Sequence, residues 1–300
     1  MHIFLGINVI IVIYHNVKNK IRRSLTVYKK YGDCFKKLRN QKNLGLSYFS
    51  KIGINRANLS RFERGQSMMS FERVDLMLEE MQVPLAEYEL IVNNFMPNYQ
   101  DFFLLELEEA DFSQDLNKIQ KLYLEAREAG KHMLSLAAKT RLENISPLEV
   151  REIENYLCNV KEWGYFELTL FYFVSDHIAI NQLENLLANF DKRCEKYCRL
   201  LKYRRRLLQI AYQSAAIFAA HGERIEAENI LEITKKYREM GVDLYAEVLR
   251  HLATGIVIFN FEDKDLGRKK INCALGALEE FGGLRLKEFY QRRLEKFLKN

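Results

Sequence analysis

Apolar residues recur at helical spacing along nearly all of the chain after residue 31. In the segment FERVDLMLEEMQV, Val74, Met77, Leu78 and Met81 occupy positions i, i+3, i+4 and i+7, which places them on one helix face. Only 3 Pro and 14 Gly interrupt the 300 residues, which is few for a turn-rich all-β protein. The pattern predicts an all-α protein.

The segment 31–97 carries the signals of five short helices. A first helix is expected over GDCFKKLRNQKN, and Leu46 and Ser47 would supply the staple and N-cap of a second, SYFSKIG. Asn55 would cap the third, RANLSRFER, which Gly65 closes.

Two further helices complete this segment. Ser70 is expected to cap FERVDLMLEEMQV, Pro84 to open LAEYELIVNNF, and Pro97 to mark a linker. Five short helices with a Gly turn at Gly53, between the second and the third, describe a helix-turn-helix domain.

The charge of the chain is unevenly distributed. Residues 1–70 hold 14 Lys or Arg and 2 Asp or Glu, whereas the net charge of the whole chain is only +6. The remaining 230 residues therefore carry a negative balance. A basic first part on an acidic remainder favours contact between the first part and a polyanion.

The third predicted helix presents candidate DNA-reading side chains. Arg56 and Ala57 lie at its first exposed turn, and Arg61 is expected one turn further on the same side. Arg can pair bidentately with guanine, and the methyl group of Ala57 can contact thymine. The alternative for any single Arg is an ordinary solvated position.

Other side chains of this helix suit the DNA backbone or the core. Asn55, Asn58 and Arg64 are better placed for phosphates, which position a domain without reading sequence. Leu59 and Phe62 are expected in the core because their spacing puts them on the opposite face.

The same residues carry a resemblance to known regulators. The stretch from Gly53 to Gly65, GINRANLSRFERG, resembles the turn and recognition helix of lambda-type repressors. LSRFERGQS, with YGDCFKKLR upstream, is more similar still to the Rgg/MutR/GadR regulators of Gram-positive bacteria, whose second helix is about two residues longer. The resemblance implies that Glu63 pairs with Arg39 as a structural ion pair.

The segment 98–300 predicts about ten helices and hence about five helix hairpins. A shift of 41 residues lays Glu226–Gly241 on Gly267–Gly282, with three identical positions. A period near 40 is typical of tetratricopeptide-like or HEAT-like stacks of helix pairs. We therefore expect an α-helical repeat domain here.

The resemblance to Rgg-type regulators extends into this segment. VKEWGYFELTLF (Val160–Phe171) and RHLATGIVIFNFEDKDLGRKKINCALGALEEFG are similar to that family's C-terminal domain, so the likeness covers roughly 31–285. It implies a regulatory domain, a homodimer and, in many members, a short secreted peptide bound on the concave face. No peptide-binding residue is carried over by motif.

Several features argue against other kinds of site. The basic run Asp191–Arg206 is interpreted as a solvated ridge, with an anion-binding patch as the alternative. Five scattered Cys without a CxxC pair favour reduced thiols over a metal site. No phosphate loop, nucleophile elbow or HExxH motif occurs, so neither a cofactor nor an enzymatic activity is expected.

The first thirty residues lack the helical pattern. Their apolar run, Ile3–Tyr14, has 12 residues, whereas a membrane span needs about 20. A basic run, Lys18 to Lys30, follows it. A β-prone strand, a membrane-surface anchor and an extension upstream of the natural start are all open, and we favour the extension.

The sequence thus predicts a cytoplasmic transcriptional regulator. Residues 1–30 form an N-terminal extension, 31–97 a lambda-repressor-like helix-turn-helix domain for promoter DNA, and 98–300 a repeat domain for dimerisation and a short hydrophobic peptide. The alternative is a helical-repeat adaptor or antitoxin-like module, which would expose an apolar patch on the third helix instead of Arg side chains.

Overall fold

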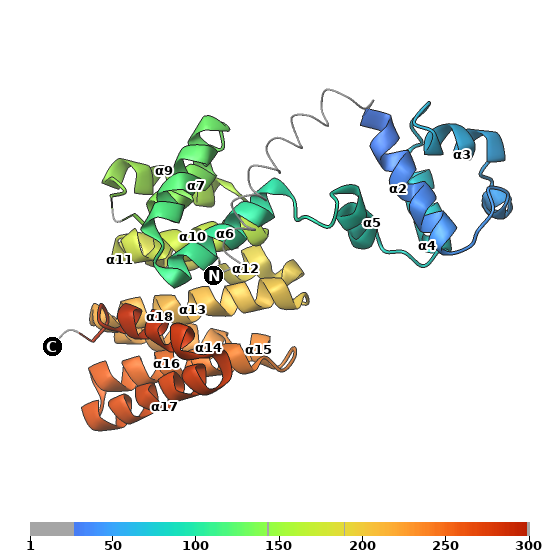
Figure 1. The fold of residues 1–300 in the computed structure, drawn as a ribbon. Coiled ribbons are helices and arrows are strands. Elements are labelled where there is room, and N and C mark those ends of the chain that lie inside the picture. Colours follow the sequence, from blue (N-terminus) through green and yellow to red (C-terminus); the bar gives the residue numbers. More distant parts are fainter. Residues whose placement is uncertain (1–26, 143, 189, 299–300) are drawn as a thin grey trace. The chain divides into compact units, whose positions relative to one another are not determined.

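The computed structural model describes residues 27–142, 144–188 and 190–298, and every regular element in them is helical (Figure 1). The predicted all-α class is confirmed. The chain divides into two compact units, of which the first ends at Asn98 and the second begins at Tyr99. Among the described residues, no helix is long and apolar enough to cross a membrane.

The first unit packs its short helices around an aromatic core. Phe35 contacts both Phe49 and Phe62, with ring centroids 5.8 Å apart in each pair. Met77 and Leu78 belong to the same core and are fully buried. The elements are α2 (Val27–Gln41), the 3-10 helix η1 (Tyr48–Ile52), α3 (Arg56–Glu63), α4 (Phe71–Glu80) and α5 (Leu85–Val92).

The second helix of this unit differs from its prediction. It is a single 3-10 helix, and Ser47 has helical backbone angles and makes no capping hydrogen bond with its side chain. Gly53, in the left-handed region at φ 77°, ends it after five residues. A segment this short holds little more than one turn, for which 3-10 geometry is common.

The first helix begins earlier than predicted, at Val27, so residues 27–30 belong to the domain and not to the extension. A Cβ added at Gly65 would lie 2.5 Å from Cα of Lys29, which shows how closely the loop after α3 packs on the first turn of α2. Lys30 also donates to Oδ1 of Asn93 at 3.3 Å. The apolar run Ile3–Tyr14 lies outside the described residues.

The second unit contains thirteen α-helices among its described residues, more than the ten expected, because short breaks divide several predicted segments. They are α6 (Tyr99–Ser113), α7 (Leu116–Glu128), α8 (His132–Lys139), α9 (Pro147–Asn159), α10 (Tyr165–Val174), α11 (Ile180–Leu187), α12 (Phe190–Cys194), α13 (Leu201–Ala220), α14 (Arg224–Ile233), α15 (Lys235–Arg238), α16 (Leu244–Phe261), α17 (Lys264–Gly282) and α18 (Leu284–Leu294), with 3-10 helices η2 (Ser175–His177) and η3 (Glu195–Tyr197).

Helix hairpins stack along this unit. Helix α7 packs on α8, α13 on α14 and α16 on α17, while α13 also packs on α16 (Figure 1). The 41-residue shift therefore lays α14 on α17, which are the second helices of successive hairpins. The likeness ends at Thr234, where α14 breaks, whereas α17 continues without interruption.

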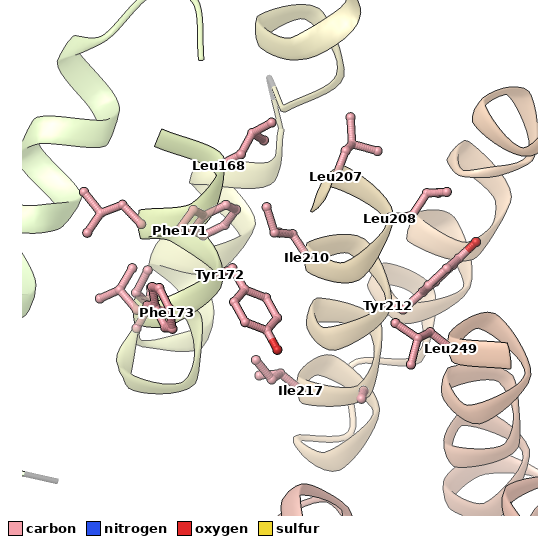
Figure 2. Packing of buried hydrophobic residues seen from close by; sticks show 14 of the residues in the cluster. Leu168, Phe171, Tyr172, Phe173, Leu207, Leu208, Ile210, Tyr212, Ile217 and Leu249 are labelled. Carbon is pink, nitrogen blue, oxygen red and sulfur yellow. The ribbon is translucent and has the colours of Figure 1, made fainter. Parts of the chain in front are cut away.

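One hydrophobic core runs through the second unit. Figure 2 shows Phe171 and Tyr172 of α10 pointing toward Ile210 and Ile217 of α13. Leu249 of α16 joins the same cluster. Helix α13 is buried along most of its length, because it has α10 on one side and α16 on the other.

The basic run 191–206 is solvated only in part: five of its basic side chains are exposed, whereas Arg193 is half-buried and Arg204 and Arg206 are buried. Arg193 donates to the Leu157 carbonyl at 2.8 Å and lies 5.2 Å from the centre of the Trp163 ring. Arg206 is 4% exposed and pairs with Glu108. These guanidinium groups bind carbonyls, a carboxylate and aromatic faces inside the protein, so both sequence interpretations are wrong for them.

The placement of α2 yields a prediction on truncation. Deleting residues 1–30 removes the turn that packs against Gly65 and the Lys30–Asn93 hydrogen bond. We expect it to lower the thermal midpoint of the first unit by several degrees, about 1 kcal/mol or more, relative to deletion of 1–26. Calorimetry of the two truncated chains measures the difference, and equal midpoints would contradict the packing role of residues 27–30.

Candidate functional site

Helix α3 begins with a side-chain cap. Asn55 has an extended backbone, and its Oδ1 accepts a hydrogen bond from the backbone nitrogen of Ala57 at 2.7 Å. Such a cap satisfies one of the free N–H groups of the first turn. Only the amide nitrogen of Asn55 is then left to donate to a phosphate.

The two faces of α3 are sharply different. Leu59 and Phe62 are fully buried, whereas Ala57, Arg61 and Arg64 are exposed. The three exposed residues follow at intervals of four and three, so they form one row on the face opposite the core. We call Ala57, Arg61 and Arg64 the outer row.

Arg56 and Asn58 are exposed beside the outer row. Arg56 and Arg61 are five residues apart, which is about 140° around a helix of 3.6 residues per turn. The expectation that they share one side is therefore wrong, and Arg56 lies at the flank. Arg64 folds back along the helix, where its Nε donates to the Ser60 carbonyl at 3.2 Å.

Arg39 and Glu63 form a buried bidentate ion pair. Nε and Nη2 of Arg39 donate to Oε1 and Oε2 of Glu63 at 2.6 and 2.9 Å. Nη1 of Arg39 also donates to the carbonyl of Leu44. The hydrogen bonds to Glu63 raise the pKa of Arg39. The pair joins α2 to α3 and holds the loop between them, which fixes the direction of the outer row.

The second unit contains a pocket between α10, α13, α16 and α18. It encloses about 440 Å³ of empty space, counting the part that opens to solvent. Its lining residues are mostly apolar or aromatic: Tyr172, Gln209, Tyr212, Gln213, Ala216, Leu249, Leu252, Ala253, Ile256, Tyr290, Arg293, Leu294 and Phe297.

The sequence identified none of these pocket residues. Leu249, Leu252, Ala253 and Ile256 occupy positions i, i+3, i+4 and i+7, so one face of α16 lines the pocket. That face has the same pattern as any core-facing helix face, and only the gap left beside it in the folded unit distinguishes it. The sequence offered one signal for the pocket, a polar residue, Gln213, within an otherwise buried stretch of α13.

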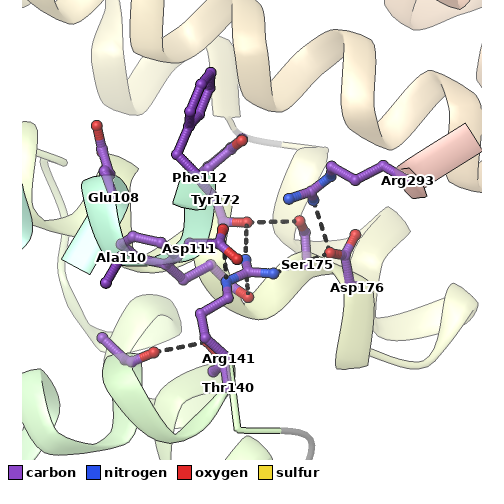
Figure 3. Close-up of polar contacts among 12 residues, drawn as sticks. Glu108, Ala110, Asp111, Phe112, Thr140, Arg141, Tyr172, Ser175, Asp176 and Arg293 are labelled. Carbon is purple, nitrogen blue, oxygen red and sulfur yellow. Dashed lines mark hydrogen bonds and ion pairs between the residues drawn. The ribbon is translucent and has the colours of Figure 1, made fainter. Parts of the chain in front are cut away.

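The carboxylate of Asp176 bonds two residues that line the pocket, Gln213 and Arg293, and Figure 3 shows it beside Arg293. Oδ2 of Asp176 accepts from Arg293 at 2.7 Å and from Arg141 at 3.3 Å, and Oδ1 accepts from Nε2 of Gln213 at 2.6 Å. Arg141 also donates to the Phe173 carbonyl at 2.7 Å. We call Asp176, Arg141, Arg293 and Gln213 the Asp176 cluster.

The opposite charges of this cluster stabilise one another in their ionised forms. Burial alone would raise the pKa of Asp176, but Arg293 and Arg141 outweigh it and keep that pKa below its usual value. Burial likewise works to lower the pKa of Arg293, and Asp176 raises it instead. Asp111, 3.6 Å from Nε of Arg141, adds a second carboxylate, so two Arg face two Asp.

The described residues show no arrangement suited to metal binding. No group of three or more His, Cys, Asp or Glu among them could hold a metal ion. Cys34, Cys158, Cys198 and Cys273 are free thiols, and two of them are buried.

Comparison with known proteins decides the family. Residues 105–292, well over half of the chain, match the model of the C-terminal domain of the HTH-type transcriptional regulator Rgg. The chain belongs to the Rgg family. The family is one of transcriptional regulators, which accords with the absence of an enzymatic motif in the sequence.

Solved structures show the same fold as this Rgg family member. The SHP pheromone receptor Rgg2 of Streptococcus dysgalactiae is 20% identical with a TM-score of 0.74, over 89% of this chain and 99% of that one. A putative transcriptional regulator of Listeria monocytogenes is 18% identical with a TM-score of 0.73, over 90% of this chain and 98% of that one. ComR of S. thermophilus was solved with DNA and its signalling peptide ComS. It is 14% identical with a TM-score of 0.57, over 89% of this chain and 99% of that one.

The Asp176 cluster yields a prediction on stability. Asp176→Asn leaves Arg293 and Arg141 without their buried counter-charge, so we expect a loss of about 3–5 kcal/mol from the unfolding free energy of the second unit at pH 7. Because the folded pKa of Asp176 is lowered, this stabilisation is present above the ordinary carboxyl pKa and is lost as the pH falls through the folded value.

The difference between wild type and Asp176→Asn should therefore shrink in acid. Denaturant unfolding of both chains from pH 7 down to about pH 3 measures it. A matched control is Asp265→Asn, because Asp265 is an exposed residue in the first turn of α17. A difference that stays constant with pH, or is no larger than in the control, would contradict the role of the carboxylate.

Proposed function

We propose that this protein is a sequence-specific DNA-binding transcriptional regulator whose second unit binds a short apolar peptide. The observation that carries the proposal is the outer row of α3, a basic face directly opposite a fully buried one. Membership of the Rgg family supports it. So does the structural likeness to ComR, which was solved with both DNA and a signalling peptide.

Within this proposal the residues of α3 have different roles. Arg61, in the middle of the outer row, and Arg56, at the first turn, reach base edges, where Arg pairs with guanine. Ala57 offers its methyl group to thymine. Asn58 and Arg64 bind phosphates, and the Asn55 amide nitrogen can do the same beyond its role as a cap.

The alternative, an adaptor or antitoxin-like module, is less well supported. A protein-binding helix would expose apolar side chains. The exposed residues of α3 are Arg56, Ala57, Asn58 and Arg61, none of which is a large apolar residue. A homodimer, implied by the family likeness, would read two half-sites about one helical turn of DNA, or a multiple of it, apart.

The first test of the proposal is DNA binding. A preferred duplex is selected from a random pool with the full-length protein, and its affinity is measured against salt for each variant. Arg56→Ala and Arg61→Ala should each cost about 1–3 kcal/mol on the selected site and relax one base position. Arg64→Ala should weaken all duplexes alike and make the salt slope shallower by about one unit.

A separate variant controls for the folding of the domain. Glu63→Ala should lower the stability of the first unit, because it leaves the buried Arg39 unpaired, without changing which bases are preferred. Equal losses for Arg56, Arg61 and Arg64 on selected and random duplexes would show that base reading is wrongly assigned. Failure to enrich any duplex, with or without peptides, would overturn the DNA-binding function.

The second test is peptide binding. Synthetic apolar peptides that correspond to short exported products of the same genome are screened by fluorescence polarisation against the full-length protein. We expect a binder at micromolar concentration whose affinity falls at least tenfold in Ala253→Trp, since the bulky side chain would fill the pocket. A binder unaffected by Ala253→Trp would place the peptide elsewhere, and no binder would contradict the peptide function.

A further inference from the structure

Two polar groups of the pocket have hydrogen-bonding capacity left over. Gln213 makes all of its hydrogen bonds to described residues through Nε2, to the Tyr172 carbonyl, Ser175 and Asp176. Because Nε2 must face the Asp176 carboxylate, the amide orientation is fixed and Oε1 faces away from it. Oε1 accepts no hydrogen bond from any residue that the structure describes.

Arg293 also has hydrogen-bonding groups to spare, and it bonds the other oxygen of Asp176. Nη2 makes the single hydrogen bond that Arg293 donates to described residues, at 2.7 Å. A guanidinium carries five N–H donors. In Figure 3 another nitrogen of Arg293 points away from Asp176. The side chain lines the pocket, and 14% of it is exposed.

One carboxylate therefore orients two residues of the pocket, one with a free acceptor and one with free donors. Oδ1 of Asp176 accepts from Gln213 and Oδ2 accepts from Arg293, so one carboxylate orients two side chains that both line the pocket. A carbonyl beside an N–H is the matching pattern, and the peptide bond is the group that offers both along one chain.

The charge balance of the pocket favours a neutral group over a free carboxylate. The positive charge of Arg293 is already opposed by Asp176, and that of Arg141 by Asp176 and Asp111. Lys296 acts on Asp176 only from an exposed position, where water screens its charge. A carboxylate entering here would lose its hydration and gain no unpaired cation.

We propose that Gln213 and Arg293 bind the main chain of an extended apolar peptide segment, with Oε1 of Gln213 accepting from a peptide N–H and Arg293 donating to a peptide carbonyl. This rests on the proposed peptide function and adds the manner of recognition. The row Leu249, Leu252, Ala253 and Ile256 takes the apolar side chains. The pair reads no side chain, so it holds the main chain in place and leaves the register and the sequence of the peptide to the apolar wall.

The test uses a blocked peptide, N-acetyl-Ile-Leu-Val methylamide, and analogues in which each N–H in turn is replaced by an ester oxygen. Binding to the full-length protein is measured by ligand-observed NMR titration. We expect one ester analogue to bind about tenfold more weakly than the parent and the others to change less, because one buried hydrogen bond is lost at one position. The free acid, N-acetyl-Ile-Leu-Val, should bind no more tightly than the methylamide.

Two conservative variants connect this effect to the pair. Gln213→Lys keeps a donor for Asp176 but removes the acceptor, so parent and weak ester should bind it equally. Arg293→Lys keeps the ion pair but replaces the planar guanidinium with a compact ammonium whose remaining N–H groups lie elsewhere, so all analogues should weaken several-fold with the ester pattern retained. Gln209→Met is the matched control, because Gln209 lines the same pocket but bonds Tyr245 and not Asp176.

The outcomes separate the inference from the function beneath it. Ester analogues that all bind like the parent, or an ester effect that persists in Gln213→Lys, would overturn main-chain recognition by this pair while peptide binding stands. Tighter binding of the free acid would show that Arg293 reads a carboxylate instead. No binding of either form at millimolar concentration, while the thermal midpoints of the variants match wild type, would contradict the peptide function of the pocket itself.

Discussion

The second unit depends on one buried carboxylate. Asp176 lies in η2, which follows α10 directly, yet its partners come from the turn after α8, from α13 and from α18. Removing a charge from water costs several kcal/mol, and good geometry with several partners is needed to offset it. Two guanidinium groups and an amide meet this requirement only when all of these helices are in place, so the cluster selects one arrangement of the stack.

The last helix of the repeat, α18, contacts elements that are not its neighbours in the stack. In an ordinary solenoid each hairpin contacts only its neighbours. Here α18 returns to α6, where the rings of Phe289 and Phe112 stack 4.8 Å apart and Arg292 donates to the Phe112 carbonyl at 3.4 Å. With Arg293 bonded to Asp176, the last helix connects elements from both ends of the unit. A ligand that contacts α16 and α18 together would therefore act on the contacts that join α18 to α6 and to Asp176.

The sequence predicted the features of the first unit that rest on local signals. The Asn55 cap and the buried pair Leu59 and Phe62 depend on neighbours within one helical turn, and the structure has all three. The Arg39–Glu63 contact came from a family likeness and is present. The errors were also local: Ser47 has too short a segment after it to cap an α-helix, and Arg56 lies on the flank by simple helix geometry.

The sequence could not predict how the helices around the pocket meet, and the reason is the distance along the chain at which their polar groups find partners. Arg206 and Arg293 resemble solvated residues in a helix with charges on every side, but their carboxylates lie 98 and 117 residues away. No periodicity relates such positions. A buried pair of this kind contributes less to net stability than to the choice of one packing over others. The residues that appear most ordinary in the sequence therefore decide how the helices meet and leave the gap between them.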